Sequence, residues 1–298
     1  MPVFPGLWAV FTVIAAAAQT VRNATQRELA QKLGTVGATH VRFLFGLPFA
    51  LVFLVGVTIV LGRAPPRPQP TYWLWVLDGA GMQFAATALM LIAMGEHSFV
   101  VTIAYIKTEP IQVALFGLIL LGDPVTLPMA IAIVTATAGV ILMSVKPGAM
   151  ATGLKPTLMG LGAGALFGLS AIGFRGAILS LQDPSFVMAA TFTLVIGLAL
   201  QTIVLTAYLY LRAPHVLFAI FRVWQPSLFA GFMGALASQF WYLAFAIATA
   251  ASVRTLALVE VVFAQAISRF VFRQPTSARE GLGIMLIVVG VVLLIWAY

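Results

Sequence analysis

Long apolar segments, separated by short polar turns, run through this chain from one end to the other. An α-helix needs roughly 20 apolar residues to cross the ~30 Å hydrocarbon core of a bilayer, and the segments have about this length. The connections contain proline, glycine and charged residues, which end helices. The pattern predicts ten membrane-spanning helices, at approximately residues 5–24, 36–61, 72–94, 98–121, 125–145, 157–180, 185–211, 226–248, 252–272 and 276–297.

Composition places the chain among integral membrane proteins. Of its 298 residues, 62% are hydrophobic and 8% are charged, whereas a soluble domain carries about 25% charged residues. The net charge of +8 therefore indicates basic loops at the membrane surface, and no nucleic-acid partner is expected. The chain has no cysteine, which excludes disulfides and thiolate metal sites, and we expect neither a cofactor nor a metal.

The predicted helix at residues 98–121 carries the main candidate for chemistry. Glu109 lies at its middle, where a carboxylate costs about 2.5–3.5 kcal/mol and should face a cavity or a partner instead of lipid. On a continuous helix, Glu109 would share one face with four other polar residues: Ser98, Thr102, Tyr105 and Gln112. This face predicts the wall of a central cavity that binds substrate or a proton. The alternative is a neutral, hydrogen-bonded carboxyl that only packs.

Other polar residues within predicted helices are candidates for the same cavity. Lys107 lies about 160° around the helix from Glu109, so its partner must come from another helix. Arg175 and Arg254 lie nearer helix ends, and either extend to the membrane surface or bind a substrate carboxylate. Glu260 has aliphatic neighbours and is either a structural carboxyl or a coupling site. The remaining candidates line the cavity or form interhelical hydrogen bonds: Gln83, Thr87, Gln239, Trp241 and Tyr242.

Aligning the chain with itself at an offset of 151 residues reveals an internal repeat. The shift superimposes five pairs of identical residues: Glu109 and Glu260, Pro124 and Pro275, Ile133 and Ile284, Gly139 and Gly290, and Val140 and Val291. Each half then holds five helices, and because five is odd, the second half enters the membrane from the opposite side. We therefore predict an inverted repeat of two five-helix domains, residues 1–148 and 149–298, as in many secondary transporters.

These features resemble the EamA-type drug/metabolite transporter superfamily. The residues that carry the resemblance are Glu109-Pro110, Gly122-Asp123-Pro124, Ala138-Gly139-Val140, Glu260, Pro275-Thr276 and Gly290-Val291. Members typically have Gly-Glu where this chain has Gly122-Asp123 and Arg273-Gln274. In layout the chain is similar to YddG-type bacterial exporters of amino acids and related metabolites.

The resemblance implies an all-α membrane protein that exports small molecules across the bacterial inner membrane by alternating access. A single chain with an internal repeat suffices as a monomer, and the expected partners are a small-molecule substrate and the lipid bilayer. A carboxylate with aromatic residues would also suit lipophilic cations. The alternative class is a membrane scaffold or an intramembrane enzyme, but the sequence has no HExxH, GxSxG or Walker A motif and we expect no enzyme.

Two arguments about membrane orientation conflict. Alternate loops hold nine cations against two on the other side, which places both termini outside by the positive-inside rule. The nine are Arg22, Arg27, Lys32, Lys146, Lys155, Arg212, Arg222, Arg273 and Arg279, and the two are Arg63 and Arg67. The family resemblance implies cytoplasmic termini instead. We adopt the prediction from the charges.

Overall fold

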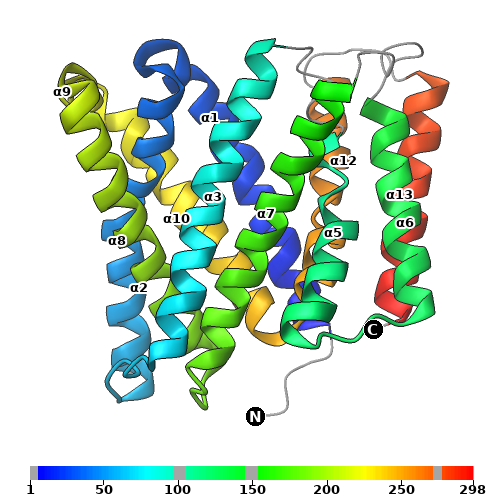
Figure 1. The fold of residues 1–298 in the computed structure, drawn as a ribbon, viewed down its shortest axis with the longest axis horizontal. Coiled ribbons are helices and arrows are strands. Elements are labelled where there is room, and N and C mark those ends of the chain that lie inside the picture. Colours follow the sequence, from blue (N-terminus) through cyan, green and yellow to red (C-terminus); the bar gives the residue numbers. More distant parts are fainter. Residues whose placement is uncertain (1–5, 97–104, 145–153, 271–276, 298) are drawn as a thin grey trace. The chain divides into compact units, whose positions relative to one another are not determined.

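The computed structural model describes residues 6–96, 105–144, 154–270 and 277–297. Regular secondary structure in these ranges is helical (Figure 1). The elements are α1 (Leu7–Leu44), α2 (Gly46–Leu61), α3 (Pro70–Glu96), α5 (Glu109–Phe116), the π-helix η1 (Gly117–Leu121), α6 (Leu127–Ser144), α7 (Leu154–Ser180), α8 (Phe186–Arg212), α9 (Pro214–Arg222), α10 (Trp224–Ile247), α11 (Ala250–Leu256), α12 (Val259–Phe270) and α13 (Ala278–Ala297).

Several of these helices have the length and composition of membrane spans. Five described segments are long and apolar enough: Glu28–Leu61, Thr157–Ser180, Phe186–Arg212, Trp224–Ile247 and Ala278–Ala297. Two shorter apolar helices are Glu109–Leu121 and Leu127–Met143. Large apolar side chains on the helices are exposed, as a surface in contact with lipid requires. The structure is thus that of an all-helical, multi-pass membrane protein, and the number of ten spans stays a prediction.

The first predicted connection is a helix in the structure. We expected a loop between residues 24 and 36, but α1 continues to Leu44 and is interrupted only at Gly34, whose φ is +70°. Glycine adopts this left-handed conformation without a steric penalty. The stretch before it is rich in Gln, Arg, Glu, Leu and Lys, which favour helix, and it contains no proline. The predicted end of the first helix at residue 24 is therefore wrong, whereas the predicted start of the next at residue 36 lies close to the interruption at Gly34.

Two compact units form the structure, and each takes segments from both halves of the sequence. The first unit comprises Met1–Ala9, Leu77–Gly176 and Ala248–Tyr298, and the second comprises Val10–Val76 and Ala177–Ile247. Most of α3 and α7 lie in the first unit, with α5, η1, α6, α11, α12 and α13. The second unit holds α2, α8, α9, α10 and most of α1. Sequence halves and compact units are therefore different divisions of the chain.

Helices α6 and α13 of the first unit pack along each other over their length (Figure 1). They are close because glycine lines the contact. A Cβ atom on Gly139 would lie 2.6 Å from the carbonyl oxygen of Gly283 and 2.8 Å from the backbone nitrogen of Ile287. Such distances leave no room for a side chain. Gly139 therefore lets α6 pack closely against α13, and we call this contact the α6/α13 seam.

The other end of the seam repeats these contacts. A Cβ atom on Gly290 would lie 2.8 Å from the carbonyl oxygen of Ala132 and 2.6 Å from the backbone nitrogen of Ala136. The shift of 151 residues relates the six seam residues in pairs: Ala132 to Gly283, Ala136 to Ile287, and Gly139 to Gly290. The two sets of contacts are thus equivalent under the shift. They also run in opposite directions along the two helices, which are antiparallel.

A second glycine-lined contact joins α7 to the segment that precedes and begins α5. Gly160, Gly164 and Gly168 lie along one side of α7, and small residues at this spacing predict a close-packing ridge. A Cβ atom on Gly160 would lie 2.6 Å from Cβ of Tyr105, and one on Gly168 would lie 3.1 Å from Cγ2 of Val113. The ridge is confirmed, and it brings α7 against the helix that carries Glu109.

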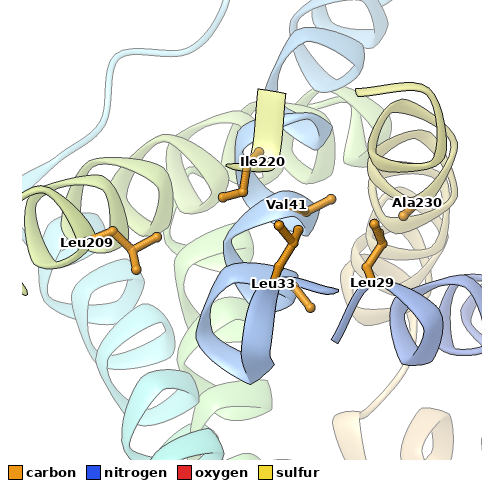
Figure 2. Close-up of a cluster of buried hydrophobic side chains, with 7 residues drawn as sticks. Leu29, Leu33, Val41, Leu209, Ile220 and Ala230 are labelled. Atoms are coloured by element: carbon orange, nitrogen blue, oxygen red, sulfur yellow. The ribbon is translucent and has the colours of Figure 1, made fainter. Parts of the chain in front are cut away.

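The second unit has an apolar core at the end where α9 lies. Leu209 of α8, Ile220 of α9 and Ala230 of α10 pack with leucine and valine side chains of α1 (Figure 2). Leu29 and Leu33 come from the part of α1 before Gly34, whereas Val41 comes from the part after it; these three and Ala38 complete the cluster. This core fixes the folded-back arrangement of α1. The exposed phenylalanines of α9 suit the membrane interface predicted for that segment.

Candidate functional site

Both predicted glutamates lie beside an interruption of a helix. A turn at Lys107 and Thr108 precedes α5, which begins at Glu109. The predicted continuous helix at residues 98–121 is therefore wrong. Pro110 explains the interruption, because it has no backbone N–H and its ring clashes with the carbonyl four residues earlier in a helix. The amide of Thr108 instead donates to the carbonyl of Tyr105, 3.1 Å away, three residues back.

The second interruption occupies the equivalent position in the other half. Helix α11 ends at Leu256, Ala257 and Leu258 form a turn, and α12 begins at Val259, just before Glu260. The 151-residue shift places the first turn on residues 258–259, so the two turns coincide to within one residue. Here the sequence contains no proline or glycine, so the predicted helix at residues 252–272 had no local signal for a break.

Two ion pairs connect the two interruptions within the first unit. Oε1 of Glu109 lies 2.8 Å from Nε of Arg254, and the two side chains are 15% and 19% exposed. Nζ of Lys107 pairs with Oε1 of Glu260, and these side chains are 24% and 16% exposed. We call these four residues the charge tetrad. It holds two positive and two negative groups, largely covered by protein.

Ion pairing offsets the unfavourable free energy of placing these four charges in apolar surroundings. A buried ion needs a partner, and removing either member of a pair leaves an uncompensated charge. Lys107 has its partner on another helix, as its position on the helix required. Arg254 was expected either to extend to the membrane surface or to bind a carboxylate, and in the structure it faces the carboxylate of Glu109. The carboxylate of Glu260 pairs with Lys107. This pairing agrees with a structural carboxyl, one of the two roles expected for Glu260 beside that of a coupling site.

The remaining polar residues near Glu109 turn toward α7 and not toward the tetrad. The hydroxyl of Thr157 donates to Oη of Tyr105 over 3.1 Å. Nε2 of Gln112 donates to the carbonyl of Leu161 over 3.3 Å. The expectation of one continuous polar face is therefore corrected, because a turn interrupts the helix between Tyr105 and Glu109, and both Tyr105 and Gln112 bond to α7. Ser98 and Thr102 lie outside the described residues.

Arg175 of α7 forms a separate, buried ion pair. Its Nε and Nη2 donate to the two carboxylate oxygens of Asp123 over 3.0 and 2.9 Å. Its Nη1 donates to the carbonyl of Ala248 over 2.5 Å. Both charged side chains are only 10% exposed. Arg175 thus ties the turn after η1 and the start of α11 to α7, which supports a structural role.

Gln83 and Thr87 lie one turn apart on α3, as their spacing predicted. The hydroxyl of Thr87 donates to the backbone carbonyl of Gln83 over 2.8 Å. One turn earlier, α3 meets α7 closely: the hydroxyl of Ser170 donates to the carbonyl of Gly79 over 2.7 Å. A Cβ atom on Gly173 would lie 2.5 Å from the nitrogen of Gly79. This crossing positions the polar part of α3 in the first unit.

The candidates on α10 belong to the second unit. Nε2 of Gln239 donates to Oγ1 of Thr191 on α8 over 2.8 Å. Nε1 of Trp241 donates to Oε1 of Gln19 on α1 over 3.2 Å. Tyr242 is buried. Of the two predicted roles, interhelical hydrogen bonding is the one seen for Gln239 and Trp241.

Sequence reasoning missed a pair of arginines in the second unit. Arg22, which we placed in a loop, is 6% exposed. Nη2 of Arg42 donates to Oγ of Ser238 over 3.5 Å. A Cβ atom on Gly234 would lie 3.1 Å from Cγ of Arg42 and 3.4 Å from Cδ of Arg22, so the two stems converge. An arginine inside the apolar segment 36–61 was the signal that could have found Arg42.

Comparison with known proteins identifies the class. The sequence model of the EamA-like transporter family matches residues 6–145. This match covers just under half of the chain, and it confirms the resemblance to that family of membrane transporters within the drug/metabolite transporter superfamily. A search of curated proteins found no match. A solved structure described only as "Crystal structure of protein" is similar over 97% of this chain and 95% of that chain, with a TM-score of 0.70 and 14% identity. That likeness shows the fold alone.

Proposed function

We propose that the protein is a secondary transporter that exports small zwitterionic metabolites, such as amino acids, across the bacterial inner membrane. The observation that carries this proposal is the Glu109–Arg254 pair, with 2.8 Å between the carboxylate oxygen and the guanidinium nitrogen. A zwitterion presents the two complementary charges to such a pair. Gln83 and Thr87 of α3 are proposed to complete the substrate site. The finer likeness to YddG-type exporters is part of this proposal.

Alternating access between two five-helix repeats is the proposed mechanism. The equivalent contacts at the two ends of the α6/α13 seam support a two-fold relation between residues 1–148 and 149–298. The equivalent helix interruptions before Glu109 and Glu260 support it independently. Interrupted helices at a site between inverted repeats are a recurring arrangement in secondary transporters.

Transport into proteoliposomes tests the proposed function. Purified protein is reconstituted and uptake of radiolabelled amino acids is measured with and without an imposed proton gradient, beside protein-free liposomes. Saturable uptake of amino acids above the protein-free control is the expected result. Uptake of tetraphenylphosphonium without uptake of any amino acid would overturn the proposal and favour a lipophilic-cation exporter, for which the carboxylate of Glu109 would be the binding group.

A further inference from the structure

We propose that the charge tetrad is an ion-pair switch that a zwitterion opens. The substrate ammonium group replaces Arg254 at Glu109, and the substrate carboxylate replaces Glu109 at Arg254. This exchange detaches α11 from α5, while the pair of Lys107 with Glu260 keeps α12 attached. The inference deepens the proposed function and rests on it, since it assigns the substrate class and the moving element of the same site.

The two pairs hold the two sides of one interruption. Arg254 lies on α11, before the turn at residues 257–258, and Glu260 lies on α12, after it. Both of their partners, Lys107 and Glu109, come from the turn that precedes α5 and its first residue. The tetrad therefore spans the turn between α11 and α12. Opening one pair and not the other changes the angle that this turn can adopt.

Helix α11 is held at each end by an arginine. At its beginning, Nη1 of Arg175 binds the carbonyl of Ala248, and the hydroxyl of Thr249 accepts from the amide of Ser252 over 3.3 Å. Near its end, Arg254 pairs with Glu109. The helix has only seven residues, so these two attachments restrain most of its length. Loss of the second attachment therefore loosens the end that carries Arg254.

Charge balance restricts which ligand can open the pair. The four side chains are 15–24% exposed, so an unpaired charge among them is strongly unfavourable. A zwitterion supplies one charge to each separated partner and leaves none unpaired. An amine without a carboxylate would take Glu109 from Arg254 and supply no negative charge in its place, and an acid without an amine would take Arg254 from Glu109 and supply no positive charge. The tetrad thus favours zwitterions over ligands that carry either charge alone.

Binding to the purified protein tests this switch separately from transport. The probes are leucine and phenylalanine, the amines that lack their carboxylates (isoamylamine and phenethylamine), and their N-acetyl derivatives, which lack the ammonium charge. The wild type should bind at least one of the two amino acids about 10- to 100-fold more tightly than its single-charge derivatives, since a hydrogen-bonded charge contributes that factor. Arg254→Gln should instead prefer the amine, and Glu109→Gln should prefer the N-acetyl acid.

Opposite preferences in the two variants cannot come from misfolding. The double variant E109R/R254E restores both charges and should again prefer the amino acid. Asp183→Asn, which breaks the Arg63–Asp183 arginine–carboxylate pair of the second unit, is the matched control and should keep the wild-type preference. Amide hydrogen exchange provides a second measurement: binding of the preferred amino acid should speed exchange several-fold in residues 250–256 and leave residues 259–263 unchanged.

The outcomes separate this inference from the proposed function. An unchanged order of preference in both single variants, no binding of either amino acid by the wild type, or slower exchange in residues 250–256 overturns the switch. If amino acids are transported in proteoliposomes despite such a result, the proposed function stands without it. If the preferences reverse as expected but no amino acid is transported, the binding switch stands and the assignment as an amino acid exporter fails.

Discussion

Replacing Gly139 with alanine should destabilise the protein even though alanine is the better helix former. The new Cβ atom would lie 2.6 Å from the carbonyl oxygen of Gly283, whereas ordinary van der Waals contact begins at 3.4 Å. The helices must therefore separate by about 0.8 Å, the difference between these two distances. The obstructing atoms belong to the backbone of α13 and cannot rotate away, so the whole seam has to shift.

The size of the effect follows from two opposing terms. Overpacking a tight contact costs about 1–3 kcal/mol, and exchanging glycine for alanine inside a helix returns at most about 1 kcal/mol. Because the clash at Gly139 is with backbone atoms, we expect the upper part of the cost range, about 2–3 kcal/mol. A net loss of about 1–2 kcal/mol then remains, which corresponds to a fall in Tm of about 2–8 °C. Gly290→Ala should give a similar loss, because its Cβ atom would lie 2.6 Å from the nitrogen of Ala136.

Thermal unfolding of the purified protein in detergent measures this prediction. Gly281→Ala on α13 is the matched control, since a Cβ atom there meets nothing within 4 Å. Its Tm should stay unchanged or rise slightly. If Gly139→Ala behaved like Gly281→Ala, the close approach of α6 and α13 would be refuted. A loss at Gly139 without a loss at Gly290 would instead refute the equivalence of the two ends of the seam.

The ion pairs and the topology give three more expectations. Glu260→Gln should lower the free energy of unfolding by about 1–3 kcal/mol, and adding Lys107→Gln should recover part of it in a double-mutant series; two fully additive losses would contradict the pairing. Asp123→Asn should cost about 3–5 kcal/mol in thermal unfolding, because it leaves the buried guanidinium of α7 unpaired, and an unchanged Tm would show that this pair does not contribute. In this cysteine-free chain, a single cysteine at Tyr298 should react with an impermeant thiol reagent in intact cells and one at Lys32 should not; the reverse pattern would favour cytoplasmic termini.

Local properties of the sequence were sufficient for the class of protein and for part of its packing. Segment length and apolar content predicted an all-helical membrane protein, because the bilayer imposes both on any spanning helix. The equivalence of Gly139 with Gly290 and of Glu109 with Glu260 also came from the sequence, since a fixed shift relates them. The glycine seam shows equivalent contacts for Gly139 and Gly290, and the match to the EamA-like transporter family supports the class of protein.

The partners of the charges were decided only by the tertiary structure. Glu109 and Arg254 are 145 residues apart, and Lys107 and Glu260 are 153 apart; helical periodicity relates only residues within a few turns. For the same reason the sequence did not predict the turn at residues 257–258, where no proline or glycine marks a break. A sequence shows that a charge within an apolar segment needs a partner. Which partner it has depends on the packing of distant helices, and so does the direction in which each polar side chain points.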